Sequence, residues 1–108
     1  MRQIKNIGYA AAGQLLDLYL PDGDGPWPLV LWTKGSGWMA DNGRTGADLV
    51  ARRLREASGG NDPAVAGFAV AGVAVRSTGQ ARFPAQVEDI QAAIRWLRAA
   101  ADRYPLDP

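Results

Sequence analysis

Two short runs of residues that are apolar on both faces constrain the fold of this chain more than any other feature. They span residues 28–33 and 68–75, a length that suits strands buried on both sides better than helices. Between them, residues 46–57 carry apolar side chains at helical spacing, with Thr45 as a candidate N-cap and two glycines beyond the end. A strand, a helix and a strand in this order predict a parallel pair with a right-handed crossover, and therefore an α/β fold.

Further elements flank this unit on both sides. Residues 2–10 and 14–20 alternate between apolar and polar side chains and predict two more strands. After the second buried strand, apolar residues recur at steps of three and four residues, at Val87, Ile90, Ile94, Leu97, Ala101 and Tyr104. This spacing predicts an amphipathic helix that starts near Pro84 and ends before Pro105. The chain is long enough for one domain, which we expect to occupy residues 1–108.

Histidine and cysteine are both absent, which excludes several kinds of site within these 108 residues. No Ser-His-Asp or Cys-His relay and no thiolate metal site can form, so we expect no catalytic residue, no metal and no cofactor. The formal net charge of +1 gives no reason to expect nucleic acid or a membrane surface as a partner. No apolar run approaches the roughly 20 residues of a membrane span, and no signal peptide is recognisable, so we expect a cytoplasmic protein.

A Gly-rich turn, residues 34–38, directly follows the first buried strand. Its two glycines together with Ala40 match the spacing of a dinucleotide-binding fingerprint. Three features count against a nucleotide site. Trp38 is bulky where the backbone would have to approach a pyrophosphate, the strand is the third element of the chain, and Arg76 stands where an acidic residue would hold the ribose.

The same turn resembles a different family. Lys34-Gly35-Ser36-Gly37-Trp38 is similar to the H-G-G-G-W segment of the esterase/lipase α/β-hydrolases related to hormone-sensitive lipase. Four other stretches resemble that family in the same order, namely LDLYLP at 16–21, FAVAGV at 68–73, FPAQVEDIQAAIRWLR at 83–98 and LDP at 106–108. The resemblance implies a partial α/β-hydrolase fold, with about four mostly parallel strands in the order 1-2-4-3 and two main helices on the faces of the sheet.

The resemblance also implies an oxyanion-hole-like site at the turn, because the family's turn donates backbone N–H groups to the tetrahedral intermediate. Ser36 and Gly37 would present the donors, Gly35 would set the turn, and Lys34 and Trp38 would line the pocket. Two departures make the site vestigial: Lys34 replaces the family's histidine, and Ser36 adds a Cβ where the family has glycine. The alternative, a strand-to-helix turn without a chemical role, stays open.

The family's nucleophile lies in a G-x-S-x-G motif beyond the next strand, and the 108 residues stop before that strand. The three serines, Ser36, Ser58 and Ser77, all lie outside any such motif. We therefore expect an incomplete carboxyl ester hydrolase domain, the N-terminal portion, truncated before the nucleophile and inactive on its own.

The implied strand order leaves the strand at 28–33 on an edge of the sheet, although its residues Leu29, Val30, Leu31 and Trp32 suit a central strand. We therefore expect a homodimer or higher oligomer that pairs through this strand, and an antiparallel arrangement would give one continuous sheet across a two-fold axis. Two alternatives stay open. A second polypeptide could complete a split serine esterase, or the chain could be a non-catalytic module that binds a small molecule.

Overall fold

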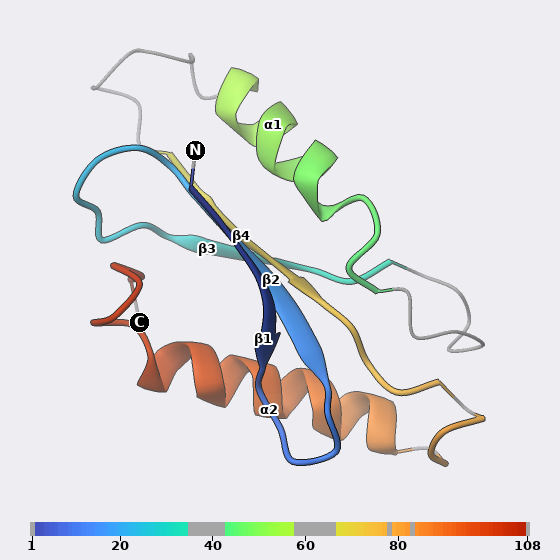
Figure 1. Ribbon diagram of the computed structural model, residues 1–108. Helices are drawn as coiled ribbons and strands as arrows, with labels where there is room; N and C mark the ends of the chain where they lie inside the picture. Colours follow the sequence, from blue (N-terminus) through green and yellow to red (C-terminus); the bar gives the residue numbers. More distant parts are fainter. Residues whose placement is uncertain (1, 35–42, 58–66, 78, 83, 108) are drawn as a thin grey trace.

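The structure is a computed structural model that describes residues 2–34, 43–57, 67–77, 79–82 and 84–107. One four-stranded sheet carries a helix on each face (Figure 1). The elements are β1 (Arg2–Gly8), β2 (Leu15–Leu20), β3 (Leu29–Trp32), α1 (Ala47–Ala57), β4 (Ala69–Val73) and α2 (Ala85–Ala99). The strand order β1-β2-β4-β3 confirms the predicted α/β class, the predicted order and the position of β3 at an edge.

The sheet is mostly antiparallel, whereas we predicted a mostly parallel one. β1 pairs with β2 and β2 pairs with β4 in antiparallel fashion, and the parallel pair is β3 with β4. The connections explain this outcome, because parallel neighbours need a crossover of about a dozen residues or more. The tight turn after β1 and the short stretch 21–28 after β2 both reverse the chain, whereas α1 provides the crossover between β3 and β4.

The side chains of β2 divide between two hydrophobic clusters, one on each face of the sheet. Leu16, Leu18 and Leu20 are fully or almost fully buried in the cluster that includes Ala93 and Leu97 of α2. Each such leucine contributes roughly 2 kcal/mol by its removal from water. Tyr19 points the opposite way, into the smaller cluster that contains Ala47 and Ala51 of α1. Both faces of β2 are therefore buried, although its sequence alternates.

Small residues let α1 approach the sheet closely. A Cβ added to Gly72 of β4 would lie 2.5 Å from the Cβ of Ala47 in the first turn of α1, far inside van der Waals contact. Since both positions are small, the helix backbone packs directly over β4. This contact fixes where α1 begins, and with it the point at which the chain returns from the Gly-rich segment.

The second helix ends earlier than its apolar spacing predicts. α2 stops at Ala99, and residues 100–105 form successive turns, although Ala101 still belongs to the core. The chain turns there because Leu106 returns to the sheet and forms a parallel bridge with Trp27, just before β3. Among the described residues, neither helix is long and apolar enough to cross a membrane.

Candidate functional site

The base of the Gly-rich segment lies at the end of β3. Lys34 is exposed, and its backbone N–H donates to the carbonyl of Gly43 across 2.8 Å. Gly35, Ser36, Gly37 and Trp38, for which we predict an oxyanion-hole-like role, lie outside the described residues. The structure therefore fixes the two ends of the segment 35–42 and shows that they meet beside the sheet.

Gly43 is required where the segment rejoins the sheet. A Cβ at this position would collide with the carbonyl oxygen of Val73, and it would lie 2.5 Å from the Oγ1 of Thr33. Only a residue without a side chain fits between the ends of β3 and β4 in this way. The exit of the Gly-rich segment is therefore held against both strands of the parallel pair.

An ion pair anchors the next residue to β2, on the face of the sheet that α1 covers. Arg44 donates through Nη1 to Oδ1 of Asp17 on β2 at 2.9 Å and to Oδ1 of Asn6 on β1 at 2.6 Å. The N–H of Asn6 also donates to Oδ1 of Asp17, at 2.9 Å. Asn6 has φ of 60° at an irregularity in the β1–β2 pairing, and this shape brings its amide to Asp17. Gly43 and Arg44 together thus tie the exit of the segment to all four strands of the sheet.

A second ion pair joins the end of β4 to α2. The guanidinium of Arg76 donates through Nε and Nη2 to the carboxylate of Asp89, with the shortest contact 2.8 Å, and the backbone N–H of Arg76 donates to it at 2.8 Å. Gln14 adds a hydrogen bond of 3.1 Å to the same carboxylate. Asp89 is 1% exposed, whereas its neighbour Glu88 faces solvent, so the two carboxylates diverge as their adjacency on a helix requires.

These contacts determine the protonation state of the buried groups. Burial alone would raise the pKa of Asp89, but the hydrogen bonds from Arg76 and Gln14 outweigh it and hold the pKa below its ordinary value. The hydrogen bond with Asp89 in turn raises the pKa of Arg76. Burial and the charge of Asp89 raise the pKa of Tyr9, which keeps its hydroxyl protonated and donating to the carbonyl of Ala74 at 2.6 Å. A carboxylate so fully occupied is an anchor and does not act as a general base.

Neither arginine had a predicted partner, because Arg44 and Asp17 are 27 positions apart in the sequence and Arg76 and Asp89 are 13 positions apart. A signal for Asp17 was present. It is a carboxylate inside a strand that the structure buries on both faces, and such a group needs a cation or several donors. For Asp89, the signal was its place on the same helix face as the apolar stripe, beside Ala93.

A polar recess of about 160 Å³ separates the two ion pairs, with Gln14, Arg44 and Arg76 among its lining residues. Ligand sites for small molecules usually exceed about 300 Å³. Both arginines of the recess already neutralise carboxylates. The recess therefore gives little support to a small-molecule module. Among the described residues, no group of acidic side chains is arranged to hold a metal ion.

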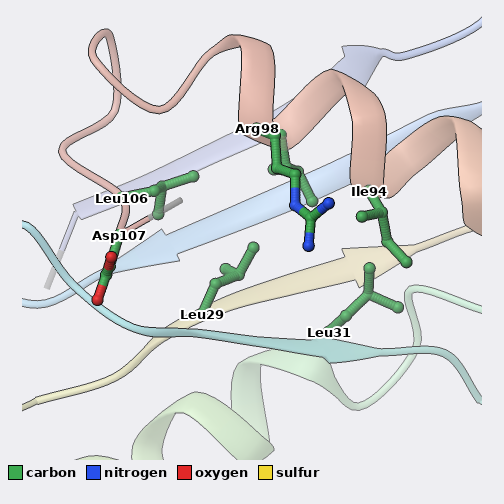
Figure 2. Close-up of a pocket in the computed structure, with 7 residues that line it drawn as sticks. Leu29, Leu31, Ile94, Arg98, Leu106 and Asp107 are labelled. Carbon is green, nitrogen blue, oxygen red and sulfur yellow. The ribbon is translucent and has the colours of Figure 1, made fainter.

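An apolar groove lies along the free edge of β3. Leu29 and Leu31 of β3, Ile94 and Leu97 of α2, and Leu106 line a pocket of about 220 Å³, with the charged residues Arg98 and Asp107 at its rim. Figure 2 shows the leucines of β3 directed toward α2, with the guanidinium of Arg98 reaching down between them. Ile94 is 39% exposed, which is unusual for a large apolar side chain on the inner stripe of a helix.

The backbone of β3 has unpaired groups on the same side. The N–H and C=O of Trp27 bond to Pro105 and Asp107, at 2.7 and 2.8 Å, whereas the C=O of Pro28 bonds to Ala69 of β4 at 2.9 Å. Since successive residues of a strand direct their backbone groups to opposite sides, those of Leu29 and Leu31 face the free edge. Within the described part of the chain, no strand pairs with them there.

The four predicted edge residues of β3 therefore divide by face. Leu29 and Leu31 face the groove, whereas Val30 and Trp32 pack toward α1. The indole N–H of Trp32 donates to the carbonyl of Thr45 at 3.1 Å, which ties β3 to the start of α1. The position of these residues at a sheet edge is as predicted, and their pairing with a partner stays a prediction.

Comparison with known proteins places this geometry in a family. The family model BD-FAE matches residues 16–108, a range that contains β2 without its first residue and every later element. No curated protein sequence is significantly similar to the chain.

Solved structures give the same relationship in three dimensions. A bifunctional GH43-CE protein of Bacteroides eggerthii is 39% identical over 97% of the chain, which covers 14% of that protein, with a TM-score of 0.79. A truncated carbohydrate esterase from gut microbiota is 30% identical over the whole chain, which covers 36% of it, with a TM-score of 0.75. Esterase B of Lactobacillus rhamnosis is 25% identical over 98% of the chain, which covers 32% of it, with a TM-score of 0.76.

The chain thus spans about a third or less of the length of these structures. Their TM-scores of 0.75 to 0.79 indicate the same fold over the matched part, and the relationship to esterases agrees with the resemblance carried by the Gly-rich turn and the FPAQ helix. The chain belongs to the BD-FAE family and forms part of an esterase-type α/β-hydrolase domain.

Proposed function

We propose that the chain supplies the oxyanion-binding part of a carboxyl ester hydrolase and that these 108 residues do not turn over ester alone. The observation that carries the proposal is the base of the Gly-rich segment, where Lys34 and Gly43 meet at the end of the parallel pair. The family resemblance assigns the donors to the segment that these two residues flank. The ends of strands are where α/β folds place their ligands.

The proposed substrates are esters carried by carbohydrates. Two of the similar structures are described as a carbohydrate esterase and as a bifunctional GH43-CE protein, and they are 30% and 39% identical to the chain. The role of the chain would be electrostatic stabilisation of the oxyanion, worth about 3 kcal/mol for each donor in serine hydrolases. The nucleophile and the general base would have to come from elsewhere, since the chain has no histidine.

We further propose that the β3 edge is the surface through which the chain associates. An apolar edge strand without protective charges pairs with another strand or aggregates. In a preparation of the 108-residue chain, the available partner is a second copy. The groove between β3 and α2 supports this proposal, because it leaves Ile94 and two leucines partly exposed beside unpaired backbone groups.

A completing polypeptide is the second candidate partner, and one specific observation favours it. The isolated bridge between Trp27 and Leu106 is parallel and lies just before β3, so a strand continued from it would run alongside β3. A polypeptide that continued this strand would fill the groove and could carry the nucleophile. This is the split-esterase alternative.

Hydrolysis of p-nitrophenyl acetate tests both parts of the proposed function. We expect the purified chain to show no rate above buffer. We expect turnover when it is refolded with a polypeptide that carries the remaining portion of the related gut carbohydrate esterase, including its nucleophile. The control is the same mixture with the nucleophilic serine of the added polypeptide replaced by alanine. Turnover by the chain alone would contradict the proposed inactivity, and a stable complex without turnover would contradict the oxyanion role.

A further inference from the structure

Three hydrogen bonds join Arg44, Asn6 and Asp17 to one another beside the exit of the Gly-rich segment. Nη1 of Arg44 donates to both side chains, and the N–H of Asn6 donates to the same oxygen of Asp17 that accepts from Arg44. The side chain of Asp17 is only 10% exposed. A buried carboxylate needs a cation or several donors, and this one has both within a single set of contacts. Removal of its charge should therefore loosen all three residues together.

The backbone of Arg44 packs against the sheet at the same place. Asp17 pairs with Gly72 of β4, and a Cβ added to Gly72 would lie 3.6 Å from both the Cα and the carbonyl oxygen of Arg44. The preceding residue, Gly43, fits against the end of β4 and accepts a hydrogen bond from the N–H of Lys34. Two consecutive residues after the segment 35–42 are therefore held by β4 through their backbone and by β1 and β2 through the Arg44 side chain.

The backbone of Asn6 is held in an unusual conformation by these contacts. Its φ of 60° lies in the left-handed region, which is unfavourable for residues other than glycine, although asparagine tolerates it better than most. Such positions persist only where their surroundings maintain them, and they are frequent at functional sites. In this chain, the residue concerned contacts the side chain that follows the Gly-rich segment.

The second ion pair has the same chemistry without this connection. Arg76 and Asp89 join the end of β4 to α2, and neither residue adjoins the segment 35–42. Both pairs have a well-buried carboxylate, since the side chains of Asp17 and Asp89 are 10% and 2% exposed. The pair of Arg76 and Asp89 is therefore a matched control within the chain for the loss of a buried ion pair.

We propose that Asp17 and Asn6 are positioning residues for the oxyanion-binding segment and that they act on it through Arg44. This inference deepens the proposed function of the segment and rests on it. Donors stabilise an oxyanion well only when they are preorganised, and a misplacement of about 1 Å can lower a rate by about 100-fold. The first two strands thereby set the efficiency of a site that begins at the end of the third.

Amide hydrogen exchange of the 108-residue chain tests the first step. The N–H of Lys34 bonds to Gly43, so its exchange reports the opening of the exit, whereas Val70 in the inner strand β4 reports opening of the sheet. We expect Asp17→Asn to accelerate exchange at Lys34 by about 10-fold more than at Val70. Asp89→Asn should accelerate both amides equally.

A charge swap provides the rescue. The double variant with Asn6→Asp and Asp17→Asn moves the carboxylate to the other side chain that Arg44 contacts. We expect it to return the ratio of the two exchange rates to within about threefold of the original. Equal acceleration at both amides in Asp17→Asn, or a ratio that the swap does not restore, would overturn the inference.

Kinetics of the complex refolded with the completing polypeptide test the second step. We expect Asp17→Asn to lower kcat for p-nitrophenyl acetate by about 10- to 100-fold and to leave KM within about twofold, because the donors act in the transition state. The charge swap should recover kcat, and Asp89→Asn should leave it within about twofold. Equal losses in Asp17→Asn and Asp89→Asn, or no loss in either, would overturn the inference. A complex of the original chain without turnover would contradict the proposed function alone, and the exchange ratio would then decide whether Asp17 holds the exit.

Discussion

The two edges of the sheet are built differently, although each ends in a strand of the same domain. β1 is seven residues long, exposes Arg2, Gln3 and Lys5, and has an irregular register between Ile4 and Ile7. Charged side chains and a bulge are the usual means by which an edge strand avoids pairing with other chains. β3 has four apolar residues, all partly buried, and lies beside an apolar groove. The comparison shows that β1 is a protected edge, whereas β3 has the character of an internal strand.

A charge placed at the β3 edge should change self-association more than any other substitution considered below. In Leu31→Lys, the ammonium group would stand in the groove beside the β3 edge, so a partner that covers the groove would have to desolvate it. We expect the self-association constant to fall by roughly 100-fold or more, a loss of about 3 kcal/mol. Gln3→Lys adds the same charge to β1 and should change nothing. Sedimentation equilibrium measures both, and equal effects at the two edges would contradict the distinction.

The next largest effect should come from the anchor of α2, which forms one wall of the groove. Asp89→Asn keeps the shape but removes the charge that Arg76 and Gln14 contact, and we expect a loss of roughly 2 kcal/mol in the free energy of unfolding. The value follows from denaturant melts at pH 7. An unchanged unfolding free energy would mean that Arg76 is satisfied equally well by solvent.

The pH dependence of the same variant has a definite sign. The pKa of Asp89 is lowered in the folded state, so its contribution is present above the unfolded value near 4 and is lost as the pH falls through the folded value. Acidification below about pH 4 should therefore destabilise the original chain more steeply than Asp89→Asn. Thermal melts between about pH 2.5 and 6 test this, and parallel curves would contradict it.

The smallest expected change in self-association concerns two positions on α2 that are about equally exposed. Ile94 and Val87 are 39% and 41% exposed, but only Ile94 lines the groove. We expect Ile94→Lys to weaken self-association by about 10-fold, because the groove no longer buries an apolar side chain, and Val87→Lys to leave it unchanged. The gel-filtration elution of each variant across a dilution series gives the comparison. Equal weakening by both would indicate a general charge effect and not a groove contact.

The parts of the fold that follow from local patterns were predictable, and the parts that depend on distant partners were not. The two strands that are apolar on both faces and both helices followed from the spacing of apolar residues. The edge position of β3 followed from the family resemblance. The antiparallel direction of β2 was not predicted. The alternation of Leu16, Leu18 and Leu20 indicates which side chains are buried, but it carries no information on strand direction. The early end of α2 was not predicted either. Tyr104 continues the apolar spacing of the helix, although the chain has already turned toward Trp27.

For the candidate site, the point where the Gly-rich segment leaves the sheet was predictable, whereas the residues that hold its exit were not. The Gly-rich turn marked the end of β3 from sequence alone. The residues that hold its exit in place, Asp17 with Arg44 and Gly43 against Val73, come together only when three strands have assembled. Nothing in the spacing of Asp17 and Arg44 indicates their contact, because it depends on the pairing of β1 with β2 and of β2 with β4.

The hydrogen bond between Lys34 and Gly43 also bears on how this domain can be engineered. Because of this bond, the two residues that flank the segment 35–42 are held together at the end of the sheet. Doubling the length of such a loop costs only about 0.6 kcal/mol in closure entropy. Chain entropy therefore sets only a small cost on a longer segment between these two residues, provided that position 43 stays glycine.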